Sequence, residues 1–187
     1  MKKSLLIVSF VLLFLSEALS EGVRTKWDEA NIKTTRLLPS TFSQLPISII
    51  NELERQKYTI PQCYNDKEPH NVISGEFKKK GQKDWAVLAS KDLQSTIIVF
   101  WNGSVSKVSK IASKPDKKYL QGIGNGNIGY SRRIGVVDKE YIIEHFNRYG
   151  GVKPPPIEHE GINDNFIFKA SVVHYFHYKW IKLTGAD

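Results

Sequence analysis

The stretch NVISGEFKKKGQKDWAVLASKDLQSTIIVFWNGSVSKVSKI, residues Asn71–Ile111, decides the fold of this chain. Short apolar runs alternate in it with Gly, Asn, Asp and Lys, which is the pattern of successive β-strands separated by turns. Strands joined this closely pair antiparallel. The stretch therefore predicts an antiparallel sheet, with strands at Val72–Phe77, Trp85–Ser90, Thr96–Trp101 and Val105–Ile111.

Asn102-Gly103 separates the last two of these strands. Both positions of the favoured two-residue hairpin turn need positive φ, and Asn-Gly is the pair that adopts it most readily. The pair predicts a tight hairpin turn. It also creates a glycosylation sequon with Ser104, but the turn accounts for both residues.

Two helices are predicted outside this stretch. Pro46–Gln56 places Ile49, Ile50 and Leu53 on one face. Lys139–Tyr149 follows Asp138, which can cap it, and ends at Gly150. More strands are expected towards the C-terminus, at Ile157–Glu160, Ser171–His177 and Lys179–Leu183. This order predicts an α+β fold, a single domain of mainly antiparallel sheet with two short helices.

The first residues have the features of a signal peptide. Lys2 and Lys3 precede the uncharged run Leu5–Leu15, and small residues stand at Ala18 and Ser20. The run is about half of the ~20 residues that a membrane-spanning helix needs, so no transmembrane segment is expected. The sequence predicts an exported protein, periplasmic or secreted, with residues 1–20 as signal peptide, 21–44 as an extended N-terminal arm and 45–187 as one domain.

Composition and charge narrow the class further. Among 187 residues, 41% are hydrophobic and 25% charged, which excludes an intrinsically disordered chain. Cys63 is the single cysteine in the sequence, so it is interpreted as a small buried residue or a free thiol. The formal charge is +8, and it is concentrated. The segment from Lys78 to Lys118 contains ten Lys and only three Asp. The rest of the chain after residue 20 has no net charge.

This local excess predicts a basic edge on the sheet. A patch of one sign attracts partners of the other, although a charge run can also be no more than a solvated face. An anionic envelope polymer or a protein partner would suit such an edge. The residues expected to bind it are Lys78, Lys79, Lys80, Lys83, Lys107 and Lys110.

GEFKKKGQKDWAVLA, residues Gly75–Ala89, resembles the FG-GAP motif of integrin-like β-propellers, in which a Gly-acid-Phe start leads into a calcium loop. The positions that would supply calcium oxygens are Lys78, Lys79 and Lys80, and ammonium groups cannot ligate calcium. The motif therefore predicts a hairpin of FG-GAP shape without a metal. One copy cannot build a propeller, which needs repeated blades.

Three stretches together resemble a group of uncharacterised exported bacterial proteins: ERQKYTIPQ with PHNVISGEFKKKGQKDWAVLA, STIIVFWNG, and IEHEGINDNFIFKASVVHYFHYKWIKLTGAD. The resemblance runs from about Leu45 to Asp187 and implies one domain and an exported location. It also implies cysteines where this chain has Tyr58 and Ala89. It carries no known activity or catalytic residue.

GNGNIG, residues Gly124–Gly129, matches the GxGxxG pattern of dinucleotide-binding proteins. That function needs a preceding strand and a following helix whose N-terminus faces the pyrophosphate. The residues before it are polar and those after it look extended, so we expect a surface loop, with no nucleotide and no other cofactor.

Candidate catalytic groups gather in one part of the sequence. A strand at Ile157–Glu160 would place Glu158 and Glu160 on one face and His159 on the other. Paired carboxylates can perform acid–base chemistry or hold a cation, but a charged edge strand in solvent has the same pattern. The candidates are Glu158, His159, Glu160, Asp164 and His145. His174 and His177 would point to opposite faces of a strand and could not share a metal ion.

Two functions remain. The preferred hypothesis is an exported, non-enzymatic binding or interaction module that uses the basic edge Lys78–Lys118. The alternative is a hydrolase of a cell-envelope polymer that uses the Glu158–Asp164 region with His145. Nucleic-acid binding is not expected, because export and the lack of an RNA or DNA module argue against it.

Overall fold

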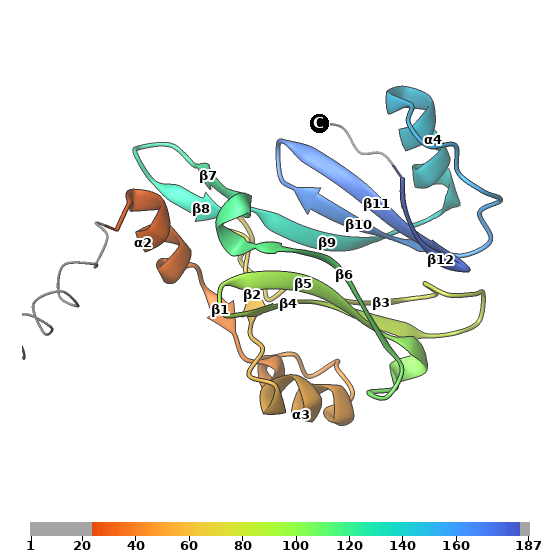
Figure 1. Cartoon of the computed structure of the whole chain (residues 1–187), viewed down its shortest axis with the longest axis horizontal. Helices are drawn as coiled ribbons and strands as arrows, with labels where there is room; N and C mark the ends of the chain where they lie inside the picture. The colour runs from red at the N-terminus through yellow and green to blue at the C-terminus, as the bar shows by residue number, and fades with distance from the viewer. Residues whose placement is uncertain (1–23, 184–187) are drawn as a thin grey trace, which may run out of the picture.

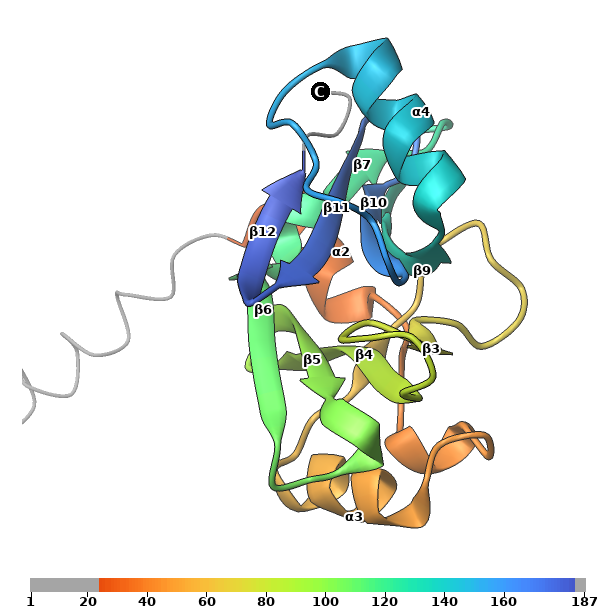
Figure 2. The same ribbon diagram turned by 90° about the vertical axis from the view of Figure 1, so that its right-hand side faces the viewer.

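Four layers build the domain in the computed structural model, which describes residues 24–183. Helix α3 (Ile47–Arg55) lies under one four-stranded sheet, a second four-stranded sheet stacks on the first, and helix α4 (Lys139–Tyr149) covers the outer face of the second (Figures 1 and 2). The predicted signal peptide, residues 1–20, lies outside the described residues.

Every strand pair in the described part of the chain is antiparallel. The lower sheet has the order β3 (Val72–Gly75), β4 (Asp84–Lys91), β5 (Gln94–Phe100), β6 (Val108–Pro115). The upper sheet has the order β12 (Lys179–Leu183), β11 (Ala170–His177), β10 (Gly161–Phe166), β9 (Arg132–Val137). Two smaller pairs are β1 (Arg36–Leu37) with β2 (Ile60–Pro61), and β7 (Leu120–Gly122) with β8 (Ile128–Tyr130). The other elements are α2 (Lys26–Lys33) and three 3₁₀ turns, η1 (Pro39–Thr41), η2 (Trp101–Gly103) and η3 (Asp116–Tyr119).

Strand β4 shows how the lower sheet is held on both sides. Trp85, Val87 and Ala89 belong to the core between α3 and the lower sheet, whereas Ala86 and Leu88 belong to the core between the two sheets. Successive side chains of a strand point to opposite faces, so a strand covered on both faces is apolar throughout. Burial of each large apolar side chain contributes roughly 1.5–3 kcal/mol, which makes this strand the centre of the fold.

The α+β prediction is confirmed at the level of class, and the finer description needs correction. Residues 24–183 contain three helices and twelve strands in four antiparallel sheets, so the domain is mostly β. The additional helix is α2, within the segment 21–44 that was expected to be extended. Thr25 starts it with a capping box, because the Thr25 hydroxyl accepts from Asp28 N at 3.2 Å and the Asp28 carboxylate accepts from Thr25 N at 2.9 Å.

The predicted tight turn at Asn102-Gly103 is wrong, although both residues do have positive φ, 50° and 68°. The first pair of strands β5 and β6 is Phe100 with Val108, so the connection is longer. The Trp101 ring is buried between the sheets and the Asn102 amide donates to Asp84, which prevents an immediate reversal. The two-residue turn lies instead at Asp92-Leu93, between β4 and β5.

The predicted helix at Lys139–Tyr149 is confirmed as α4, with both of its ends. It spans Lys139–Tyr149, the Asp138 carboxylate accepts from Tyr141 N at 2.8 Å, and Gly150 ends it with a φ of 71°. The prediction of a strand at Ile157–Glu160 is wrong, since this segment is irregular and β10 begins at Gly161.

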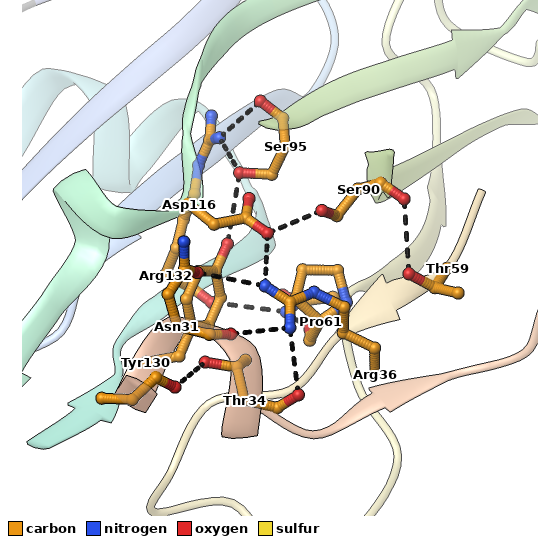
Figure 3. Close-up of polar contacts among 12 residues, drawn as sticks. Asn31, Thr34, Arg36, Thr59, Pro61, Ser90, Ser95, Asp116, Tyr130 and Arg132 are labelled. Carbon is orange, nitrogen blue, oxygen red and sulfur yellow. Dashed lines mark hydrogen bonds and ion pairs between the residues drawn. The ribbon is translucent and has the colours of Figure 1, made fainter. Parts of the chain in front are cut away.

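Arg132 on β9 joins the two sheets. Its guanidinium donates to both carboxylate oxygens of Asp164 on β10 at 2.8 Å each, within the upper sheet. It also donates to Ser95 Oγ on β5 at 2.9 Å (Figure 3). A further bond goes to the Ala112 carbonyl on β6 at 2.7 Å, so both partners belong to the lower sheet. Arg132 is fully buried and stacks over the Tyr119 ring at 4.3 Å. Burial alone would raise the pKa of Asp164, but contacts with His174 and Arg132 outweigh it and lower that pKa.

A second buried ion pair fastens the N-terminal segment. One oxygen of the buried Asp116 carboxylate accepts from Arg36 at 2.7 Å and from the Ser90 hydroxyl at 2.6 Å (Figure 3). Arg36 also donates to the Asn31 side chain at 3.2 Å, at the end of α2. These bonds connect α2 and β1 with the lower sheet.

Strand β6 is irregular where Arg132 reaches it. The pairing of β5 with β6 shifts between Ser95 and Ile97, and Ala112 has a φ of 53°. This is the geometry of a β-bulge, which bends the strand and turns a carbonyl away from the ladder. The Ala112 carbonyl becomes available to Arg132 in this way.

We expect Arg132→Ala to lower the free energy of unfolding by about 3–5 kcal/mol, because it leaves the Asp164 carboxylate buried without its partner. The neighbouring Arg133→Ala is the matched control. Arg133 is half exposed and its contact with Asp66 is 3.2 Å, so its loss should cost less than about 1 kcal/mol. Urea unfolding of the three proteins measures both values, and equal losses would contradict the role given to Arg132.

Candidate functional site

The turn between β3 and β4 holds Lys78, Lys79 and Lys80 in a fixed place. The preceding Phe77 is fully buried and anchors the turn in the core between the sheets. The buried Asp84 carboxylate accepts from Lys78 N at 3.0 Å, Gln82 Nε2 at 2.7 Å and Asn102 N at 2.7 Å. The three lysine side chains are exposed, and Lys78 Nζ lies over the Trp101 ring at 5.6 Å.

Gly75 lets a second segment approach the start of the turn. Glu160 accepts from the Glu76 amide at 2.8 Å, and the Glu160 amide donates to the Glu76 carbonyl at 3.2 Å. A Cβ at Gly75 would lie 2.6 Å from that Glu160 oxygen, so only glycine fits here without displacement. The chain before β10 is thereby fixed against the lysine turn.

Tyr175 and His159 fix the same segment to β11. The Tyr175 hydroxyl accepts from Glu158 N at 3.0 Å, and the rings of His159 and Tyr175 stack at 4.4 Å with 11° between their planes. Both ring nitrogens of His159 lie 2.9 Å from main-chain carbonyl oxygens, of Glu160 and Phe176. The His159 side chain therefore holds the backbone before β10 against β11.

Tyr178 stands at the tip of the β11–β12 hairpin. His177 pairs directly with Lys179, so the chain reverses at Tyr178, which adopts a φ of 59°. The side chain is 91% exposed. Positive φ is costly for a tyrosine, and an exposed aromatic ring held there is a candidate for contact with a ligand.

These parts meet in one hollow of about 470 Å³, which we name the lysine groove. One wall comes from the lower sheet and the other from the upper sheet. Its lining residues are Lys78, Lys79, Lys80, Glu158, His159, Tyr175, Phe176, His177 and Tyr178. A smaller hollow of about 250 Å³ shares Lys80, Glu158 and His159 with it and is mainly acidic, through Glu76, Asp138, Glu140 and Glu160.

The other predicted binding lysines lie elsewhere. Lys83 sits over the Trp85 ring at 4.9 Å, and Lys110 donates to the Tyr58 hydroxyl at 3.0 Å. Both rings belong to the core on the α3 side of the lower sheet. Lys107 is exposed in the connection to β6. The structure thus brings together Lys78–Lys80 and separates them from Lys83 and Lys110.

Of the five candidate catalytic residues, Glu158, His159 and Glu160 border the smaller acidic hollow together, whereas Asp164 and His145 lie elsewhere. Glu158 and His159 line the lysine groove, and Glu160 is bonded to the Glu76 amide. Asp164 is buried in its ion pair with Arg132. His145 lies on α4 between the rings of Tyr141 and Tyr149.

Cys63 is buried, and burial raises the pKa of its thiol. The thiol donates to the Asn65 side chain at 2.9 Å. The nearby His70 accepts from the Cys63 main-chain amide at 2.7 Å. A nucleophilic cysteine requires a lowered pKa, so this environment does not activate it.

Gly124–Gly129 spans the tip of the β7–β8 hairpin and the start of β8, and the element that follows is strand β9. In the part of the chain that the structure describes, no three His, Cys, Asp or Glu side chains are grouped as a metal site would require. Between residues 24 and 183 no helix is long and apolar enough to cross a membrane. Comparison with protein-family models, curated proteins and solved structures gives no match.

Asp84→Asn tests how the lysine turn is held. An amide has one accepting oxygen in place of two, so its NH₂ would face a main-chain donor, Lys78 N or Asn102 N. We expect a loss of about 1–3 kcal/mol in the free energy of unfolding and faster amide hydrogen exchange over residues 77–83. Asp92→Asn in the exposed β4–β5 turn is the control. Unchanged exchange in D84N would contradict the proposed anchoring.

Proposed function

We propose that this protein is a non-enzymatic binding module that takes an acidic polysaccharide of the cell envelope in the lysine groove. The observation that carries the proposal is the meeting of three consecutive exposed lysines with the exposed aromatic tip of the β11–β12 hairpin in one hollow. Export through the N-terminal signal peptide belongs to the same proposal.

Charge supports an anionic partner. Lys78, Lys79 and Lys80 line the groove with one carboxylate, that of Glu158, and Lys80 also borders the adjoining acidic hollow. Their backbone is already fixed by Phe77 and Asp84, so binding does not need to order the turn. Three adjacent cations on a rigid turn attract a polyanion and hold it in a salt-dependent manner.

The aromatic side of the groove supports a sugar rather than an unstructured polyanion. Tyr178 is almost fully exposed, and an amphipathic ring of this kind offers both an apolar face and a hydroxyl. The nonpolar face of a sugar ring can pack on it while acidic groups reach the lysines.

The hydrolase alternative is less well supported. General acid–base catalysis requires the acid and base to lie within hydrogen-bond reach of the reacting group. Asp164 is committed to Arg132, His145 lies on α4, and both nitrogens of His159 face carbonyl oxygens. Glu158, His159 and Glu160 do lie together, but the Glu160 carboxylate accepts from the Glu76 amide.

The experiment compares K78E/K79E/K80E with K91E/K114E/K118E, which has the same net charge. Lys91 ends β4, about 23 Å along the strand from Asp84, and the control lysines are exposed. With polygalacturonate as the probe in a salt series, we expect the first variant to lose at least tenfold in affinity at low salt and to show a weaker salt dependence. The control should lose much less. Equal losses would show attraction by net charge alone.

Tyr178→Asn separates the aromatic contribution from charge. Asparagine tolerates positive φ better than tyrosine, so stability should be kept or improved. We expect a two- to fivefold weaker affinity for polygalacturonate. Undiminished binding would remove the sugar-ring contact from the proposal. Release of shortened chains by the wild-type protein, lost in Glu158→Gln, would replace the binding module by a hydrolase.

A further inference from the structure

Another hollow, of about 360 Å³, lies between α4 and the β10–β11 hairpin. We name it the α4 groove. Helix α4 lies on the outer side of the upper sheet, whereas the lysine turn belongs to the lower sheet (Figure 2). The α4 groove therefore does not depend on the function proposed for the lysine groove.

The groove exists because α4 packs on the sheet through a narrow contact. Ile142 is the buried residue of this helix, and it lies in the core with Val173 and Tyr175 of β11. Further along the helix, Tyr149 is 46% exposed. The groove lies between this part of the helix and Lys169, Ala170 and Ser171 of the hairpin.

Three aromatic rings form the helix wall. Tyr141, His145 and Tyr149 follow each other at intervals of four residues, which places them on one side of a helix. The Tyr141 and His145 rings stack at 5.5 Å with 12° between planes, and His145 meets Tyr149 at 4.8 Å. The Tyr141 hydroxyl lies 3.3 Å from Asn163 Nδ2 on β10, so this row of three aromatic side chains is attached to the sheet.

The charges on the two walls favour an anion. Arg148 on the helix and Lys169 on the hairpin both line the groove, against the single carboxylate of Glu144. Each cation lies over a neighbouring ring, Arg148 over Tyr149 at 6.0 Å and Lys169 over Phe166 at 4.8 Å. The first contact holds Arg148 beside the tyrosine wall. Phe166 alternates on β10 with the lining residue Asn165 and lies on the other face of the strand, so Lys169 stands at the rim of the groove.

We propose that the α4 groove binds a small organic carboxylate that carries a flat ring. The ring would pack against the tyrosine wall, the carboxylate would bind Arg148, and Lys169 at the rim would add to the positive potential. A hollow of this volume is in the range of small-molecule sites, and such sites combine aromatic walls with a few placed charges. The carboxylate would also be close to Ser171, whose hydroxyl is held by Asn163.

An NMR titration of the amide signals tests the proposal, with benzoate as the probe. Benzamide has the ring without the charge, and acetate has the charge without the ring. We expect benzoate to shift amides of residues 144–149 and 169–171, and to bind at least tenfold more tightly than either control compound. Equal binding of benzamide or acetate, or benzoate shifts centred elsewhere, would overturn it.

A pair of matched variants tests which positive side chains bind the carboxylate of benzoate. R148Q/K169Q removes the two groove cations, both exposed, and should weaken benzoate about tenfold. K139Q/K153Q removes the same charge from the beginning of α4 and from the chain after its end, outside the groove, and should leave the affinity within twofold. Unchanged affinity in R148Q/K169Q, with the folded spectrum retained, would also overturn the proposal.

Discussion

The guanidinium of Arg132 is the constraint on which the arrangement of the two sheets depends. A fully buried cation is tolerated only when its hydrogen bonds and its charge are satisfied. Arg132 achieves this with one partner carboxylate in its own sheet and with Ser95 and Ala112 in the other. Apolar packing would allow the sheets to slide over each other at modest cost, whereas these directional bonds permit one relative position.

The shape of the lysine groove depends on this fixed position of the two sheets. Its two walls are the β3–β4 turn of the lower sheet and the β11–β12 hairpin of the upper sheet. Neither wall forms a hollow alone. Glu160 and His159 then link the same two regions at the surface, through bonds to Glu76 and to the Phe176 carbonyl. The position of the lysines relative to Tyr178 is therefore set by polar contacts both inside and outside the core.

The sequence predicts local elements well where one physical rule dominates. The apolar runs of β4 and β5 and the capped helix after Asp138 are examples. Helix α2 escaped prediction although Thr25 and Asp28 form a capping box, because its apolar periodicity is weak and its buried residue is Asn31. The connection at Asn102-Gly103 depends on Asp84 and on burial of Trp101, neither of which a turn motif contains.

The candidate site could be predicted only in pieces. Lys78–Lys80 stand out by charge and Glu158–His159 by chemistry, but about eighty residues separate them, and their meeting follows from the stacking of two sheets. Asp164 illustrates the opposite case. Its carboxylate has the same chemistry as a catalytic group, and only its burial beside Arg132 shows that it is structural.

The bulge at Ala112 has a consequence for how this protein behaves among copies of itself. Strand β6 is an outer strand of its sheet, and a regular outer strand offers unpaired amides and carbonyls to any other extended chain. Here the strand is bent at Ala112, one of its carbonyls is turned inward to Arg132, and Lys110, Lys114 and Pro115 lie along it. The residue that joins the sheets also helps to blunt this edge against strand-by-strand aggregation.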